Sequence, residues 1–290
     1  MFEKEPSRTA FAAAAHRAAH QILDQGRIFS DPLALSILGV DAETVSRHAE
    51  AEPSERGMRL FIASRTRFAE AELEAGMKSR GIRQLVVLGA GLDTFAYRHP
   101  LAHRLRIFEV DHPATQAWKR RRLGESGIAI PKSLVFVPVD FERDALSSSL
   151  ETAGFDPDQR TFFMWLGVVP YLSGDTVIST LTSIAKLPGG AEVVFDYSNP
   201  LGALSSERHA IHKQLAERVA AVGEPFLSYF DTATLHAALV KLDLIDIEDC
   251  DESALVARYV APQTIPARSR HGVLIVEQGG HVIWAATKAE

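Results

Sequence analysis

Residues 84–94 read Gln-Leu-Val-Val-Leu-Gly-Ala-Gly-Leu-Asp-Thr, an apolar run that passes directly into a glycine-rich turn. An uninterrupted apolar run bounded by glycine is typical of a strand buried on both faces of a parallel sheet. Glycine also lets the backbone turn sharply and come close to a ligand. This stretch therefore predicts a buried strand that ends at a binding turn.

Further apolar runs follow at intervals that leave room for crossover helices. They are residues 106–110, 134–139, 161–166 and 191–195. The segment 173–187 is long enough to be one such helix. Alternation of short buried strands with helices predicts an α/β fold with a doubly wound sheet.

The two ends of the chain depart from this rhythm. We expect helices over 8–24, from Asp31 onward and over 53–80, so that residues 1–82 form an N-terminal helical cap. Residues 83–290 form the ligand-binding domain, in which 199–230 is a candidate substrate cover. The patterns after residue 230 predict a helix at 231–239, a strand at 242–247 and an antiparallel hairpin of 272–276 with 281–285.

Composition excludes several classes of protein. The 290 residues carry 31 Lys+Arg against 37 Asp+Glu, a net charge of −6, so no strongly basic nucleic-acid footprint is present. We interpret residues 119–122, Lys-Arg-Arg-Arg, as the solvated last turn of a helix rather than a phosphate site. The single Cys250 and the absence of Cys/His zinc spacing predict neither a disulfide nor a metal site.

The sequence also lacks the marks of a membrane or exported protein. No apolar run approaches the ~18 residues that span a bilayer, and the first residues do not resemble a signal peptide. We therefore expect a cytoplasmic protein without a membrane partner. The sequence leaves the oligomeric state open.

Three strand ends carry the informative residues. Ligands of open α/β sheets bind beyond the carboxyl ends of the strands, where the strand order reverses. Here those ends are the turn 89–91, Asp111 and the pair Asp140-Phe141. The Asp111 carboxylate can accept both hydrogens of a ribose diol, and Asp140 with Phe141 can contact an adenine. Together these positions predict an adenosine-containing ligand.

Two such ligands have to be weighed. A dinucleotide site normally shows Gly-x-Gly-x-x-Gly, but the sixth position here is Thr94, which favours S-adenosylmethionine over NAD(P). Structural explanations stand beside this one. The glycines can serve the turn alone, and Asp111 and Asp140 can simply cap the helices that follow.

A family resemblance appears at the same places in the chain. The stretches that carry it are 64–68, 84–94, 97–98, 108–113, 140–141 and 165–172. In combination they resemble the leucine carboxyl methyltransferase family and its bacterial relatives, among them mycobacterial methyltransferases and O-methyltransferases of polyketide biosynthesis. The resemblance covers most of residues 8–200.

The resemblance implies a fold and a cofactor. The fold is a mainly parallel, seven-stranded class I methyltransferase sheet with an N-terminal helical cap and a C-terminal antiparallel hairpin. The cofactor is S-adenosyl-L-methionine. Its implied contacts are Arg65 for the methionine carboxylate, Gly89, Ala90 and Gly91 beneath the amino acid moiety, Asp111 for the ribose, and Asp140 and Phe141 for the adenine. Arg17 aligns with a family lysine that reaches the cofactor, and Leu166 stands where the family has a glutamate.

The expected reaction is O-methylation of a small molecule. A carboxylate acceptor is already ionised at neutral pH, whereas a hydroxyl acceptor would benefit from a general base. Tyr171 and Tyr197 follow the fourth and fifth strands and are the candidate acceptor-side residues; no catalytic base is assigned. The alternatives are an NAD(P)-dependent oxidoreductase and a non-catalytic protein that binds S-adenosylmethionine.

Overall fold

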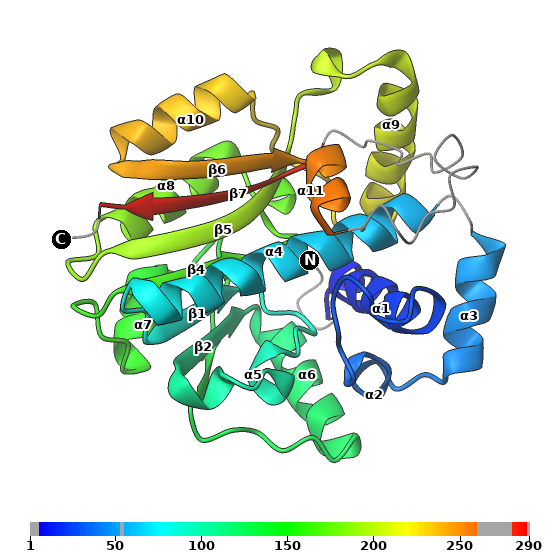
Figure 1. Cartoon of the computed structure of the whole chain (residues 1–290), viewed down its shortest axis with the longest axis horizontal. Coiled ribbons are helices and arrows are strands. Elements are labelled where there is room, and N and C mark those ends of the chain that lie inside the picture. Colours follow the sequence, from blue (N-terminus) through cyan, green and yellow to red (C-terminus); the bar gives the residue numbers. More distant parts are fainter. Residues whose placement is uncertain (1–5, 53–54, 260–279, 289–290) are drawn as a thin grey trace.

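A seven-stranded sheet forms the centre of the protein in a computed structural model that describes residues 6–52, 55–259 and 280–288. Its strands are β1 (Gln84–Leu88), β2 (Arg106–Asp111), β3 (Leu134–Pro138), β4 (Thr161–Trp165), β5 (Ala191–Ser198), β6 (Leu244–Asp251) and β7 (Gly280–Thr287). The order across the sheet is β3-β2-β1-β4-β5-β7-β6. The strands from β1 to β5 are parallel, and β7 runs antiparallel between β5 and β6 (Figure 1).

Helices cover both faces of this sheet. They are α1 (Arg8–Leu23), α2 (Ala34–Leu38), α3 (Ala42–Ala51), α4 (Arg56–Ser79), α5 (Phe95–Arg98), α6 (Pro113–Glu125), α7 (Leu146–Thr152), α8 (Gly174–Ala185), α9 (Ser206–Ala221), α10 (Thr232–Lys241) and α11 (Glu252–Tyr259). Short 3-10 turns lie at Ala102–Arg104, Val169–Tyr171 and Leu201–Ala203. The predicted doubly wound α/β fold is confirmed.

Alternate residues along the strands pack into two separate hydrophobic cores, one on each face of the sheet. On one face Leu85 and Val87 pack with Phe68 and Leu73 of α4. On the other face Val86 packs with residues of α7, α8 and α10. All five residues of β1 are buried, which explains why this strand is apolar without alternation.

The N-terminal helices assemble around α1. Ala14 and Ala18 of α1 are fully buried against Ile37 of α2 and Leu123 of α6. Small side chains on α1 allow the helices to come close together. Figure 1 shows α4 lying across the face of the sheet, beside α1 and α11. Helix α4 therefore packs directly on the strands, and the boundary proposed at residue 82 stays a prediction.

Some local expectations need correction. A separate helix, α3, occupies residues that the sequence analysis left without one, and α11 was also missed. The predicted hairpin partner, 272–276, lies outside the described residues; in the part of the chain that is described, the antiparallel neighbours of β7 are β5 and β6.

The first residue of the basic run 119–122 is buried, whereas a solvated helix end was expected. Lys119 is only 1% exposed, and its ammonium lies 2.7 Å from the Glu109 carboxylate on β2. The interpretation of this residue as part of a solvated helix end was therefore wrong. The sequence of the helix did not predict that Lys119 is buried, because the carboxylate that pairs with it lies on β2 and not on the helix.

Candidate functional site

A cavity of about 1310 Å³ opens at the carboxyl edge of the sheet. Its floor comes from the ends of β1, β2, β3, β4 and β5, and its walls come from α1, α4, α9 and the segment after α9. The strand order reverses between β1 and β4, which is where open α/β sheets bind their ligands. Of the predicted site residues, those at the cavity are Arg17, Arg65, Gly89, Ala90, Gly91, Asp111, Asp140, Phe141, Leu166 and Tyr171.

The turn after β1 is built around two glycines with positive φ. Gly89 has φ +63°, and a Cβ placed there would lie 2.3 Å from Val168. Gly91 has φ +45° and lies against Ala10 of α1. Both the backbone conformation and the close packing require glycine at Gly89. The turn therefore lies closely between β4 and α1, with its backbone against the cavity.

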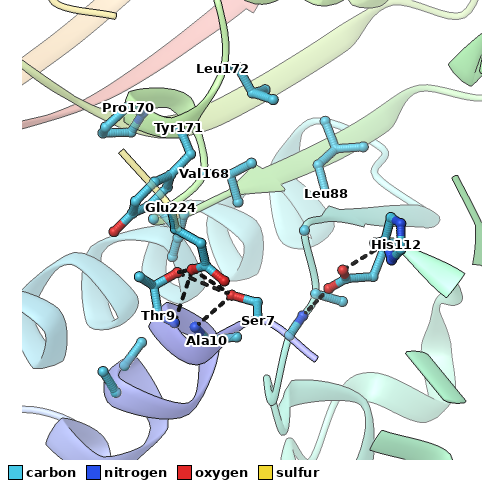
Figure 2. Close-up of a pocket in the computed structure, with 18 of the residues that line it drawn as sticks. Ser7, Thr9, Ala10, Leu88, His112, Val168, Pro170, Tyr171, Leu172 and Glu224 are labelled. Atoms are coloured by element: carbon cyan, nitrogen blue, oxygen red, sulfur yellow. Dashed lines mark hydrogen bonds between the residues drawn. The ribbon is translucent and has the colours of Figure 1, made fainter. Parts of the chain in front are cut away.

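Asp111 fixes this turn from the neighbouring strand. One carboxylate oxygen accepts the Gly91 N–H at 2.5 Å, and the other accepts the His112 N–H at 2.7 Å (Figure 2). Burial raises the pKa of the Asp111 carboxyl, although both N–H groups oppose this shift. A carboxylate has about four acceptor sites, so two bonds leave capacity for a ligand diol.

Arg65 reaches the cavity from α4. Its Nη1 donates to Asp196 on β5 at 2.7 Å, and the second Asp196 oxygen accepts the Gly167 N–H at 2.5 Å. The Arg65 Nε is buried and has no hydrogen-bond acceptor among the described residues. A buried guanidinium N–H without an acceptor is costly, and an anionic ligand group would satisfy it.

Sequence reasoning missed Asp196. It lies inside the buried strand β5, is 5% exposed and lines the cavity. The available signal was an aspartate directly after the apolar run 191–195, the same pattern that singled out Asp111. Its carboxylate therefore joins α4, β4 and β5 at the edge of the sheet.

Arg17 supports the glycine turn. Its Nη2 donates to the carbonyl of Leu92 at 2.5 Å, and its Nε donates to Asp31 at 3.3 Å. Asp31 also accepts the Thr94 hydroxyl at 2.8 Å. The turn is thus held from α1 as well as from β2.

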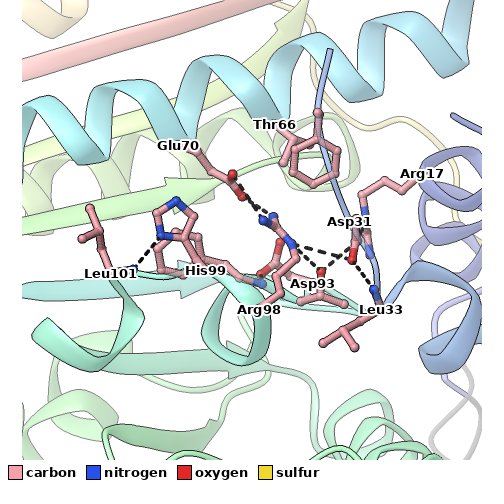
Figure 3. A network of polar contacts seen from close by, with 12 residues as sticks. Arg17, Asp31, Leu33, Thr66, Glu70, Asp93, Arg98, His99 and Leu101 are labelled. Atoms are coloured by element: carbon pink, nitrogen blue, oxygen red, sulfur yellow. Dashed lines mark hydrogen bonds and ion pairs between the residues drawn. The ribbon is translucent and has the colours of Figure 1, made fainter. Parts of the chain in front are cut away.

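This support extends into a buried polar network that the sequence did not reveal. Arg98 donates to Thr94 at 3.0 Å and forms an ion pair with Glu70 of α4 (Figure 3). Burial raises the pKa of the Glu70 carboxyl, although Arg98 opposes the shift. The network connects α1, α4 and α5 behind the cavity.

Asp140, Phe141 and Leu166 lie along the floor. Asp140 accepts the Glu142 N–H at 3.1 Å, and its side chain is partly exposed to the cavity. Leu166 packs with the core beneath α4 and offers no polar group. The floor therefore has a carboxylate and an aromatic ring at the end of β3, and an apolar side chain at the end of β4.

The two candidate tyrosines lie in different places: one lines the cavity and the other does not. Tyr171 lines the cavity, and burial raises the pKa of its hydroxyl to about 12. Tyr197 is 1% exposed and does not reach the cavity; its hydroxyl donates to Asp249 at 2.6 Å and lies 3.0 Å from the Thr232 hydroxyl, which can donate to it. Asp249 also contacts His236 and His281. The prediction of Tyr197 as an acceptor-side residue is corrected, because its side chain points into a polar network around β6 and β7.

Glu224 closes one side of the cavity by binding the start of α1. Its carboxylate accepts the Arg8 N–H at 3.0 Å and the Ser7 hydroxyl at 3.1 Å, and it also accepts the Thr9 hydroxyl (Figure 2). An acidic group at a helix N-terminus is favoured by the exposed N–H groups and the helix dipole. No sequence pattern predicted this contact between Glu224 and the start of α1.

A metal cluster and a membrane-spanning helix are both absent from the described parts of the chain. No cluster of three His, Cys, Asp or Glu side chains there is arranged to hold a metal ion. No helix in the ranges 6–52, 55–259 and 280–288 combines the length and apolar character needed to cross a bilayer.

The fold and the site define a doubly wound α/β protein with a mainly parallel sheet and a cavity at its carboxyl edge. The chain belongs to the leucine carboxyl methyltransferase family, whose sequence model matches residues 10–185.

Comparison with individual proteins agrees with this assignment. A Bacillus subtilis relative named "Putative S-adenosyl-L-methionine-dependent methyltransferase YktD" is 39% identical over 152 residues, which are 52% of this chain and 50% of the relative. A Mycolicibacterium paratuberculosis relative of the same description is 34% identical over 204 residues, 64% of each chain. The matched part of the chain thus spans between half and two thirds of the length of these relatives.

Solved structures share the fold. A Thermobifida fusca protein described as a "putative methyltransferase" has a TM-score of 0.60 at 15% identity, covering 99% of this chain and 97% of its own. A DUF574 family protein from Streptomyces avermitilis has a TM-score of 0.55 at 13% identity, with 94% and 97% covered. At these identities the likeness concerns the fold alone.

Proposed function

We propose that this chain is an S-adenosyl-L-methionine-dependent methyltransferase that methylates an oxygen of a small molecule, a carboxylate or a hydroxyl. The observation that carries the proposal is the buried Arg65 Nε without an acceptor, in the same cavity as the glycine turn and Asp111. The names of the relatives support the same donor.

The residues present fit this donor end to end. Arg65 would bind the methionine carboxylate through its free N–H, and the turn at Gly89 and Gly91 gives the amino acid moiety a close approach to the backbone. Asp111 would accept the ribose hydroxyls with its remaining lone pairs. Phe141 and Asp140 would contact the adenine at the end of β3.

Leu166 cannot bind the positively charged amino group of the donor, so another carboxylate has to do so. Asp196 lies on the next strand, lines the same cavity and is already fixed by Arg65 and Gly167. A carboxylate in this position takes the place of the family glutamate within the proposal.

The protein's part in the reaction is alignment in a dry site. The bound donor supplies an electrophilic methyl group on a sulfonium, and transfer requires the acceptor oxygen within about 3–3.5 Å of that methyl, opposite the sulfur. The walls from α1, α4 and α9 surround the cavity, and a bound acceptor would displace water from it. Exclusion of water favours a reaction in which an anion meets a cation.

A labelled-methyl assay tests the proposal. The protein is incubated with S-adenosylmethionine carrying a labelled methyl group and with a panel of carboxylic, phenolic and aliphatic hydroxyl compounds. We expect transfer of label to an oxygen of at least one acceptor and formation of S-adenosylhomocysteine. Asp158→Asn, at an exposed position outside the cavity, serves as the control. Donor binding without transfer to any acceptor would instead favour a non-catalytic binding protein.

A further inference from the structure

One wall of the cavity is aromatic and is assembled from two distant parts of the chain. Tyr171, after β4, lies 5.2 Å from Phe226 between ring centres, and Phe226 lies 5.5 Å from the His212 ring of α9. All three side chains line the cavity. We call these three residues the aromatic wall. Aromatic rings at such separations favour offset or edge-to-face packing, in which an additional aromatic ring can take part.

His212 is unusual within this wall. The residue is 1% exposed, and its Nδ1 is buried without a hydrogen-bond partner among the described residues. Burial lowers the pKa of the imidazole, a hydrogen bond with the backbone of His212 itself opposes this shift, and His209 adds to it. The ring is therefore neutral at pH 7, with one nitrogen able to accept a proton. A ligand in the cavity would give such a buried imidazole a hydrogen-bond partner from outside the protein.

The charge around the aromatic wall disfavours an anionic acceptor. The cavity-lining residues from α9 and residues 222–227 include no Lys or Arg but do include Glu224. His16 lines the cavity from α1, and burial lowers its pKa to about 4, so it too is neutral at pH 7. The guanidinium of Arg65 is already paired with Asp196. The charge of Arg65 acts on Tyr171, but Asp196 already pairs with it, so a carboxylate acceptor would lack an unpaired cation at this wall, whereas a neutral phenol would not need one.

We propose that the acceptor is a neutral aromatic alcohol held against the aromatic wall, and that His212 is the catalytic residue that removes its hydroxyl proton. This inference rests on the proposed function. The O–H bond of the acceptor breaks as its proton passes to the imidazole. The oxygen forms a bond to the methyl carbon, and the methyl–sulfur bond breaks with its electron pair staying on sulfur. The products are the methyl ether and S-adenosylhomocysteine, and His212 returns its proton to solvent.

The test compares matched acceptors and variants. 2-Naphthol and 2-naphthoate differ in the group that would be methylated but share the ring. With the full chain we expect methylation of 2-naphthol and not of 2-naphthoate. His212→Gln should lower kcat for 2-naphthol by about 10²–10⁴-fold, the usual range for loss of a general base. Gln214→Ala, at an exposed position of α9 that does not line the cavity, should change kcat less than twofold.

Three readouts separate a catalytic role from a structural one. S-adenosylhomocysteine should bind His212→Gln within twofold of the unaltered protein, which shows that the variant folds. The rise of kcat/KM with pH below 7 should disappear in this variant. Imidazole in the buffer should restore activity to His212→Ala, whose smaller side chain leaves space for it.

The outcomes that overturn the proposal are distinct from failure of the proposed function. Absence of donor binding contradicts the proposed function itself. If the donor binds, the inference about His212 is contradicted by methylation of 2-naphthoate in preference to 2-naphthol. It is also contradicted by an unchanged kcat in His212→Gln, or by failure of 2-naphthol to bind the S-adenosylhomocysteine complex at 1 mM.

Discussion

Thr9 and Glu224 are 215 residues apart in the sequence, yet the Thr9 backbone N–H donates to the Glu224 carboxylate at 3.1 Å. Thr9 lies in the first turn of α1 and Glu224 in the segment after α9. Both residues line the cavity, so their contact fixes two of its walls to each other. Retention of a ligand in the cavity should therefore depend on this contact.

Glu224→Gln should weaken that contact, because an amide is a poorer partner than a carboxylate for several N–H and hydroxyl donors. We expect the dissociation rate of S-adenosylhomocysteine to rise and the free energy of unfolding to fall by about 0.5–2 kcal/mol, as for loss of a helix cap. Stopped-flow displacement and urea unfolding measure the two effects. Glu217→Gln, at an exposed position of α9, is the control, and equal dissociation rates in both variants would refute the role of Glu224.

Asp111→Asn should lower donor affinity by about 1–3 kcal/mol, because the ribose diol loses a charged acceptor. The amide oxygen can still accept one of the Gly91 and His112 N–H groups, so the fold should survive. Calorimetric titration with S-adenosylhomocysteine measures the change. Unchanged affinity would remove Asp111 from the ribose site.

Arg65→Met should affect both stability and donor binding. It leaves the buried Asp196 carboxylate without its cation, and breaking a buried ion pair in this way costs about 3–5 kcal/mol. Adding Asp196→Asn should recover much of the stability but not the affinity for S-adenosylhomocysteine. Urea unfolding and calorimetry on both variants check this. Recovery of affinity in the double variant would show that Arg65 does not bind the donor carboxylate.

Asp249 should make a pH-dependent contribution to stability. Burial raises the pKa of its carboxyl, but hydrogen bonds from His281, Tyr197 and His236 outweigh this effect and lower it below the usual value. A carboxyl with a lowered pKa in the folded state stabilises the protein above its unfolded pKa, and that stabilisation is lost as the pH falls through the folded pKa.

Asp249→Asn should accordingly lower the free energy of unfolding at pH 7 by about 1–3 kcal/mol, the range for a buried group that loses hydrogen-bond partners. The difference between the variant and the unaltered protein should shrink as the pH falls below the unfolded pKa of an aspartate, about 3.9, toward the lower folded pKa. Urea unfolding across this pH range measures it. A difference that is the same at every pH would contradict the lowered pKa.

The sheet could be predicted because its central strands β1 and β4 are buried along their whole length and are therefore largely apolar, as residues 84–88 illustrate. Once these strands are assigned as parallel, their carboxyl ends are expected at one edge of the sheet. Asp111 and the turn at Gly89 could be assigned to one edge, since parallel strands end on the same side of a sheet.

Contacts between distant polar side chains could not be predicted in this way. Glu224 meets the start of α1, Lys119 pairs with Glu109, and Tyr197 turns toward Asp249. Each of these depends on the relative placement of two elements, which local periodicity does not encode. His212 could not be predicted either, because no sequence motif marks it. What distinguishes it is a buried Nδ1 without a hydrogen-bond partner among the described residues.

The central claim is that one cavity at the carboxyl edge of the sheet binds an adenosyl sulfonium donor. Isothermal titration of the full chain with S-adenosylmethionine, S-adenosylhomocysteine and NADH tests it most directly. We predict saturable binding of both sulfur compounds below 1 mM, tighter than about −4 kcal/mol, and no binding of NADH. Binding of NADH alone, or no binding of either sulfur compound at 1 mM, would contradict the claim.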